Sequence, residues 1–354
     1  MEHWLPPGTP GSTGGTLYNY QLVECLSRHA EVEVVALNAP DRSVPDGVKL
    51  TTFQEKFPGF RGSRVISWRS TLMSQLPKDG VGRILITTTS TNTVIGLAKK
   101  RGYKTISIVQ AYEDFGVRVP GGSMHDRLKG FKKRIATSQW FSAGLLKADH
   151  IVANSDYMRR ALGGILECRR PISIVHPPLT LGLNLHMEFS LAALNSVGFV
   201  HRTGKNLAFL IELALATPQK QFLVFGHPIQ GEAQLPDNMK FCGWASDRRA
   251  MFQQASTWVM PSLWSEPFGL VAVEALSQGC RVAVSRRGGL PEAVGLAGAI
   301  FDDFNVHQWA NWLMSEAGSC VTQPIFDHLD SFSIEKFEKG IFRAIDGAFF
   351  GCQP

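Results

Sequence analysis

The most informative stretch of the sequence is PSLWSEPFGLVAVEALSQGCRVAVSRRGGLPE, residues 261–292. Its pattern predicts a strand that ends at residue 262 and a loop that carries residues 266–269. A helix is expected from Leu270, and Gly279 suits the position just beyond its last turn because glycine accepts a left-handed backbone there. Another strand is expected at 281–284. This order of elements is typical of a parallel sheet.

The alternation of strand and helix patterns extends in both directions from this stretch. Strands are expected at 31–37, 83–87, 104–109, 148–153 and 172–175, and then at 197–200, 221–226, 239–242 and 258–260. Helical patterns are found at 15–29, 92–101, 156–162, 205–216 and 247–254. Strands separated by helices predict an α/β protein built from βαβ units.

The length of 354 residues indicates two domains. His176-Pro177-Pro178 ends the fifth strand, and residues 179–194 show no clear period, so we expect a linker there. The predicted boundaries are an N-terminal domain over 1–178, a C-terminal domain over 195–332, and a last helix over 333–350.

The start of the helix at Leu270 is a candidate site for phosphate. Backbone N–H groups at a helix N-terminus lack intrahelical partners and carry the positive end of the helix dipole. Gly269 lets a ligand approach the backbone closely. Glu266 and Glu274 flank these donors, and carboxylates accept hydrogen bonds from sugar hydroxyls. From the residues alone, a nucleotide-sugar site and a capped helix with two surface glutamates both stay open.

Residues 261–292 resemble the C-terminal motif of retaining glycosyltransferases of family 4. The shared parts are Pro-Ser, Glu-Pro-Phe-Gly-Leu, Glu-Ala, Gly and Gly-Gly-x-Pro-Glu, found here at 261–262, 266–270, 274–275, 279 and 288–292. The resemblance extends over residues 11–345 and includes Gly14-Gly15, Asp149 to Ser155, His176-Pro177-Pro178, Lys205-Asn206 and Asn238 to Gly243. It implies the GT-B fold: two Rossmann-like doubly wound domains that face across a cleft. The first would bind the acceptor and the second the nucleotide sugar.

The resemblance implies roles for four side chains. Glu266 is expected to hold hydroxyls of the donor sugar, and Glu274 those of the ribose. Lys205 is expected to neutralise the diphosphate as it leaves, because fixed cations aimed at developing negative charge lower the barrier. The preceding strand reads Gly198-Phe199, where the family usually has Gly-Arg. Arg202 is the candidate replacement, and an exposed loop arginine without this role is the equal alternative.

The remaining site residues follow from the same comparison. The donor is expected to face the glycine-rich loop at Gly14 and Gly15 and the backbone of Phe268, Gly269 and Leu270. Gln110 stands where many members carry a histidine near the reacting carbon. Its amide can bind a sugar hydroxyl but cannot move a proton. The catalytic candidates are therefore Glu266, Lys205, Arg202 and Gln110.

Composition sets limits on cofactors and location. The sequence has no Asp-x-Asp triplet, and its six cysteines form no CxxC pair, so no metal site is predicted. No cofactor is expected beyond the nucleoside-diphosphate sugar that serves as co-substrate. Apolar runs fall short of the ~20 residues that span a bilayer. The first residues do not resemble a signal peptide, so a cytoplasmic location is predicted.

Residues 118–134 contain six basic residues and one acidic residue, in a chain of net charge +6. A solvated helix face is one interpretation. The other is contact with an anionic partner, which includes the inner face of a membrane where a lipid-linked acceptor would lie. Nucleic acid is not expected, because no RNA-recognition or zinc-finger signature accompanies the patch.

These observations together predict a metal-independent retaining glycosyltransferase with a role in polysaccharide biosynthesis. It would move a sugar from a nucleoside-diphosphate sugar to a glycan or lipid-linked glycan. Two alternatives stay open. One is a nucleotide-sugar epimerase of the same fold. The other is a non-catalytic nucleotide-sugar-binding or scaffold protein, which the residues Gln110 and Phe199 favour.

Overall fold

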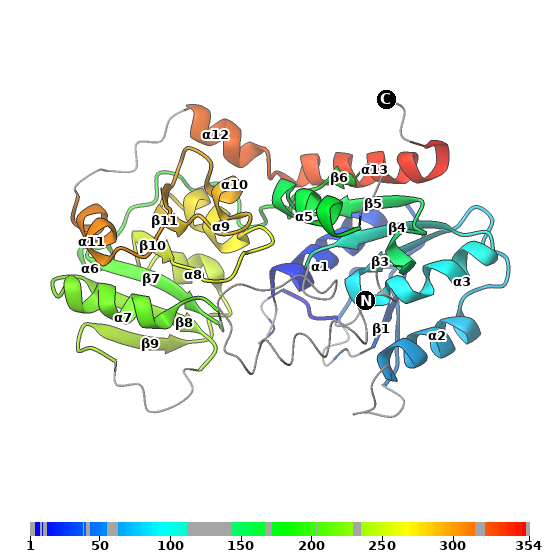
Figure 1. Ribbon diagram of the computed structural model, residues 1–354, viewed down its shortest axis with the longest axis horizontal. Coiled ribbons are helices and arrows are strands. Elements are labelled where there is room, and N and C mark those ends of the chain that lie inside the picture. The colour runs from blue at the N-terminus through cyan, green and yellow to red at the C-terminus, as the bar shows by residue number, and fades with distance from the viewer. Residues whose placement is uncertain are drawn as a thin grey trace. The chain divides into compact units, whose positions relative to one another are not determined.

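The computed structural model divides the chain into two compact units (Figure 1). Unit 1 comprises Met1–Pro178 and Ile334–Pro354, and unit 2 comprises Leu179–Ser333. The structure describes residues 4–7, 9, 13–37, 39, 43–54, 63–111, 143–166, 172–202, 204–228, 235–315 and 323–351. Because unit 1 contains both ends of the described chain, unit 2 is inserted between them.

Unit 1 begins with a helix and ends with one. Its elements are α1 (Gly14–Ser27), β1 (Glu33–Ala36), β2 (Lys49–Thr52), α2 (Ser63–Gln75), β3 (Ile84–Thr88), η1 (Thr89–Val94), α3 (Ile95–Lys100), β4 (Lys104–Val109), β5 (His150–Ala153), α5 (Asp156–Leu166), β6 (Ile172–Ile174) and α13 (Ile334–Phe350). Strands β3, β4, β5 and β6 form one parallel sheet in that order, and β1 pairs with β2.

The last helix, α13, completes the core of unit 1. Its apolar positions recur at helical spacing, so one face carries Phe337, Ile341 and Ala344. This face packs with α1 against β4 and β5 (Figure 1). Tyr18 of α1 meets Phe337 edge to face, with 5.1 Å between ring centroids. Unit 1 therefore depends on residues from both ends of the sequence.

Unit 2 is a doubly covered parallel sheet. Its elements are α6 (Leu191–Leu194), β7 (Ser196–His201), α7 (Leu207–Ala216), β8 (Gln221–Gly226), β9 (Met239–Gly243), α8 (Arg248–Phe252), β10 (Thr257–Met260), α9 (Leu270–Ser277), β11 (Arg281–Ser285), α10 (Leu290–Val294), β12 (Ala299–Phe301), α11 (Val306–Met314) and α12 (Gln323–Asp330). The strand order is β12-β11-β10-β7-β8-β9, with every pairing parallel.

Successive residues of the central strands supply two separate cores. In β10, Val259 packs in a cluster with α7 and α11, whereas its neighbours Trp258 and Met260 pack with α8, α9 and α10. In β11, Ala283 faces the first cluster, and Val282 and Val284 face the second. This alternation follows from the two-residue period of a strand. Burial on both faces explains why these strands read as continuous apolar runs.

The strand order of unit 2 reverses direction between β7 and β10. The chain runs from β7 outward through β8 and β9, then returns to pair β10 with the other side of β7. Ligands of open α/β sheets bind outside the carboxyl ends of the strands at such a switch point. The loops that follow β7 and β10 are therefore the first place to look for a site.

The structure differs from the sequence patterns in several elements. A 3₁₀ turn, η1, precedes α3 where one helix over 92–101 is expected, and the Thr91 side chain bonds the Thr88 backbone there. Residues 179–194 lie within unit 2 rather than forming a free linker, because Leu179 donates to the carbonyl of Phe332 (2.7 Å). The patterns also miss α2, β2, α6, α10, β12, α11 and α12.

Candidate functional site

Lys205 stands on a tight turn after β7. Its N–H donates to the carbonyl of Arg202 (3.0 Å), and Gly204 adopts a positive φ of 90°. The carbonyl of Gly204 accepts the N–H of Leu263 (3.0 Å), which follows β10. The loops of the two strands beside the switch point are thus hydrogen-bonded to each other. This arrangement fixes the backbone from which the lysine side chain projects.

Glu266 follows β10, and its carboxylate forms an ion pair with Lys205. The two side chains are 7% and 16% exposed, respectively, so the pair is largely shielded from water. Ser262 Oγ donates to the same Oε1 of Glu266 (3.1 Å). Shielded charges attract strongly but lose their hydration. A lysine held here can turn to a second anion, such as a phosphate, that enters the site.

The backbone of Glu266 is held by the loop after β11. The N–H of Gly289 donates to the carbonyl of Glu266 (2.7 Å), and Gly288 forms an isolated parallel bridge with Glu266. Gly288 has a positive φ of 63°, and a Cβ there would clash with the backbone of Glu266. The glycines at 288–289 therefore allow the two backbones to approach closely, and this contact positions Glu266.

The N-cap of α9 lies three residues after Glu266. Gly269 is the N-cap residue with φ 115°, a conformation that suits glycine, and a Cβ there would reach Leu290 Cδ2 at 2.7 Å. Leu270 is the first helical residue. Phe268 turns its ring into the core against Phe332, with centroids 5.3 Å apart. The side chain of Phe268 is thus structural, and only its backbone remains as a candidate ligand contact.

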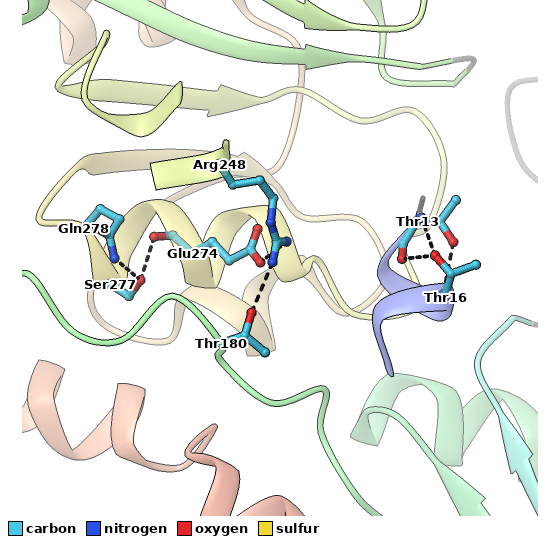
Figure 2. Close-up of polar contacts among 7 residues, drawn as sticks. All are labelled: Thr13, Thr16, Thr180, Arg248, Glu274, Ser277 and Gln278. Atoms are coloured by element: carbon cyan, nitrogen blue, oxygen red, sulfur yellow. Dashed lines mark hydrogen bonds and ion pairs between the residues drawn. The ribbon is translucent and has the colours of Figure 1, made fainter. Parts of the chain in front are cut away.

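Glu274 lies within α9, and its carboxylate forms an ion pair with Arg248 at the start of α8 (Figure 2). The Glu274 side chain is 1% exposed. Burial raises the pKa of Glu274 to about 7, although the charge and hydrogen bond of Arg248 lower it. The sequence predicts Glu274 as a candidate site residue. It does not predict that Glu274 is buried or that Arg248 is its partner.

The unit 1 candidates gather where α1 meets the end of β4. Gln110 Nε2 donates to Asn19 Oδ1 (2.8 Å). Gln110 Oε1 lies so near Gly15 that a Cβ on the glycine would be 2.9 Å from it. Gly14 is the first residue of α1, and Thr13 and Thr16 form a capping box there (Figure 2). Gly15 and Gln110 are brought together, with the amide oxygen of Gln110 toward the helix start.

Packing explains both residues of the Gly198-Phe199 pair, of which Phe199 is the departure from the family's Gly-Arg. A Cβ on Gly198 would overlap the ring of Trp258, so this position admits only glycine. Phe199 is buried in the core beneath α7 and cannot contact a ligand. Arg202 is exposed at the turn that leads to Lys205. The structure thus leaves Arg202 free to face solvent and gives it no fixed place in the site.

Sequence reasoning missed two polar partners. Arg248 follows Asp247, the N-cap of α8, and a basic residue at a helix start reads as an exposed one. Asn19 lies on the buried face of α1 among apolar residues. A polar residue at an apolar helix position was the available signal for Asn19. Nothing in the spacing of Arg248 links it to a glutamate 26 residues later.

Some expectations fall outside the described residues. The basic stretch at 118–134 lies wholly within a part that the structure does not describe. Within the described ranges, no cluster of three His, Cys, Asp or Glu residues forms a metal site. No helix among the described residues has the length and apolarity to cross a membrane.

The sequence comparisons find similarity to glycosyltransferases. Residues 194–315 match the family described as Glycosyl transferases group 1. D-inositol 3-phosphate glycosyltransferase from Mycobacterium sp. (strain KMS) is 31% identical over 144 residues, which are 35% of this chain and 33% of that protein. The Mycobacterium leprae (strain Br4923) protein of the same name is 30% identical over 197 residues, 47% of this chain and 45% of that protein. The chain spans 33% to 45% of the length of these curated relatives.

Solved structures establish the fold of the whole chain. Anabaena HepE in complex with UDP-glucose has a TM-score of 0.65 at 15% identity, covering 98% of this chain and 98% of that one. The lipopolysaccharide outer core galactosyltransferase WaaB, in apo form, has a TM-score of 0.65 at 16% identity, with the same coverage of both chains. The chain therefore has the GT-B fold, and residues 194–315 of its second unit are similar to the family of glycosyl transferases group 1.

Proposed function

We propose that this chain is a retaining, metal-independent glycosyltransferase that uses a nucleoside-diphosphate sugar. One observation carries the proposal: Lys205 and Glu266 pair at the strand-order switch point of unit 2, three residues before the N-cap of α9. The N–H groups of α9 and the ammonium of Lys205 supply positive charge for a diphosphate. Glu266 and Glu274 supply acceptors for hydroxyls of the sugar and ribose.

The chemistry follows from where charge develops. As the bond between sugar and diphosphate breaks, negative charge grows on the departing phosphate oxygens. Lys205, released from Glu266 by the incoming anion, would neutralise that charge without a divalent cation. The sequence contains no Asp-x-Asp triplet, in agreement with this division of roles. The departing phosphate oxygen would accept the proton of the acceptor hydroxyl. The acceptor would then bond to the sugar on the same face from which the diphosphate leaves, so the anomeric configuration is retained.

The donor and acceptor are proposed by class. HepE binds UDP and UDP-glucose, which makes uridine nucleotides the first donors to test. A glycan or lipid-linked glycan is the proposed acceptor, at a cytoplasmic membrane face that residues 118–134 contact. Replacing Lys129, Lys132, Lys133 and Arg134 with glutamine is expected to abolish cosedimentation with anionic phosphatidylglycerol vesicles. Unchanged cosedimentation contradicts the membrane contact.

Thermal shift tests the donor site directly. UDP-glucose, UDP-galactose, GDP-mannose and the free diphosphates are the probes. A ligand at 100 times its dissociation constant adds about 2.7 kcal/mol to the free energy of unfolding. Lys205→Met and Glu266→Gln are expected to lose that gain. Lys49→Met, which removes an exposed lysine paired with Glu33 (3.0 Å), is the matched control and should keep it. If no nucleotide stabilises the protein, the proposed function is wrong.

Turnover separates transfer from the two alternatives. The active donor is incubated with a panel of glycan, lipid-linked and D-inositol 3-phosphate acceptors, and the anomeric configuration of the product is read by NMR. Retention supports the proposal, and inversion contradicts it. Interconversion of the free donor without acceptor indicates an epimerase. Binding with no turnover on any acceptor indicates a non-catalytic protein, which the amide of Gln110, unable to move a proton, would favour.

A further inference from the structure

The two oxygens of the Glu274 carboxylate have different surroundings (Figure 2). Oε1 pairs with Arg248 Nη1. Oε2 is shielded from water, and among the described residues it has no hydrogen-bond partner. A buried acceptor without a donor is costly and rare in folded proteins. Oε2 is therefore a carboxylate oxygen to which no described residue donates, and a ligand could supply that donor.

Arg248 is itself anchored from a second side. Its Nη2 donates to Thr180 Oγ1 (3.1 Å), a residue at the start of unit 2 (Figure 2). The neighbouring Arg249 donates to the carbonyl of Leu181. One terminal nitrogen of Arg248 contacts Glu274 and the other contacts Thr180. The planar guanidinium group is therefore held in one orientation. A fixed guanidinium holds the carboxylate that it contacts in one orientation.

The exposure of the pair is uneven. The Arg248 side chain is 23% exposed, whereas that of Glu274 is 1% exposed. Arg248 is therefore the member that reaches solvent.

Arg248 opposes the effect of burial on the pKa of Glu274. Burial raises the pKa of this glutamate, and among the described groups Arg248 is the one whose charge and hydrogen bond lower it again. The elements packed on α9 carry other titratable groups, none of which contributes to this shift: Arg281 on β11, Glu292 on α10, and Asp327, His328 and Asp330 on α12. Loss of Arg248 would leave a neutral carboxyl near pH 7.

We propose that Arg248 is a positioning residue of the donor site, which holds Oε1 of Glu274 and so leaves Oε2 to accept a ribose hydroxyl of the nucleotide. This inference rests on the proposed function, because it takes the ligand to be a nucleotide sugar. A purely structural ion pair makes a different prediction: its loss lowers the free energy of unfolding and leaves the recognition of ribose unchanged.

The test compares nucleotides that differ in one ribose hydroxyl. Isothermal titration measures the dissociation constants of UDP, 2′-deoxy-UDP and 3′-deoxy-UDP, with the GDP series in parallel. The wild-type chain is expected to bind one ribonucleotide about tenfold more tightly than a deoxy analogue, the scale of one hydrogen bond to a charged group. This deoxy penalty should disappear in Glu274→Gln and in Arg248→Met. It should remain in the control Arg249→Met, which removes an arginine of the same helix that does not contact Glu274.

The pH dependence provides a second readout that a structural role would not move. Glu274 accepts a hydroxyl best as the carboxylate, so the deoxy penalty should fall as the pH drops through about 7 in the wild-type chain. In Arg248→Met, any remaining penalty should have its midpoint at higher pH. Arg248→Gln keeps a donor for Oε1 without the charge, and it replaces the methionine variant if that variant does not fold. The pH midpoint of the deoxy penalty should also rise in Arg248→Gln.

The outcomes separate the inference from the proposed function. One outcome is that the deoxy penalty is lost in Glu274→Gln but persists in folded Arg248→Met or Arg248→Gln, with the same pH midpoint as in the wild-type chain. That outcome overturns the positioning role of Arg248 and leaves the donor site intact. If the wild-type chain binds nucleotides without any deoxy penalty, the ribose contact is overturned. If no nucleotide binds at all, the proposed function itself fails.

Discussion

Lys205 and Glu266 are separated by 61 positions in the sequence, yet they form one ion pair because they follow β7 and β10, which are adjacent in the sheet. The chain leaves β7, builds β8 and β9 on one side, and returns to place β10 on the other side. A reversal of strand order at this point brings the two loops together. The pair is therefore a product of topology as much as of residue type.

Separating this pair should cost more than removing it. Lys205→Met leaves the buried Glu266 carboxylate without its cation and should lower the free energy of unfolding by about 3 kcal/mol. The double variant Lys205→Met/Glu266→Gln should be less destabilised than the sum of the two single variants. Urea unfolding measures all three, with the exposed pair variant Lys49→Met as a control near zero. Additive losses would contradict a coupled pair.

The buried Glu274 predicts an unusual pH dependence of stability. Its pKa is about 7 in the folded chain against an ordinary value of 4.5. Between these values the folded state binds more protons than the unfolded state, so this group favours folding at low pH and loses that effect as the pH rises through 7. Relative to Glu274→Gln, the wild-type chain should lose on the order of 3 kcal/mol between pH 4.5 and pH 8. Thermal unfolding of both proteins across this range measures it. Parallel curves would show that the carboxyl is not buried in the folded chain.

A methyl group at Gly15 should lower activity without lowering stability. The Cβ of Gly15→Ala would lie 2.9 Å from Gln110 Oε1 and displace the amide from Asn19. Alanine within a helix favours folding by up to about 1 kcal/mol, which offsets the displacement. We expect a melting temperature equal to or above that of the wild-type chain and at least a tenfold loss of kcat/KM. Gly163→Ala on α5 has open space around its Cβ and should gain stability with full activity. Equal activity in Gly15→Ala and Gly163→Ala would contradict a role for Gln110 in the site.

Gly269→Ala should harm both the fold and the donor site. Alanine at φ 115° is strained, and its Cβ would press on Leu290 at 2.7 Å. Together these effects should lower the free energy of unfolding by about 1–3 kcal/mol. Gly243→Ala also has a positive φ, 78°, but open space, so it should lose less. Urea unfolding and nucleotide titration check both variants. Equal losses would show that Leu290 yields to the added methyl.

The sequence predicted the elements whose pattern is strong. Strands buried on both faces, such as β8 and β11, are continuous apolar runs, and the sequence pattern predicts their bounds to within one residue. By contrast, β2 reads Lys49-Leu50-Thr51-Thr52, which is too short and too polar to be distinguished from a loop. The GT-B fold expected from residues 261–292 is confirmed by the solved structures.

The candidate site could be predicted only in part. The positions of Glu266 and Lys205 follow from the motif, but their pairing requires the strand order, which no local pattern encodes. The departure at Phe199 cannot be judged from sequence, because only the folded chain shows that this ring is buried in the core with residues of α7. The roles assigned to Arg202, Gln110, Gly14 and Gly15 stay predictions.

The return of α13 to unit 1 has a consequence for any attempt to divide the protein. Unit 2 is one uninterrupted piece of chain, Leu179–Ser333, and a gene fragment can encode it directly. Unit 1 has no such fragment, because deleting everything after residue 333 strips Phe337 and Ile341 from the face of its sheet. To produce unit 1 alone, residue 178 would have to be joined to residue 334 through an artificial bridge. A stop codon at position 334 would therefore damage unit 1, although most of its residues are encoded before position 179.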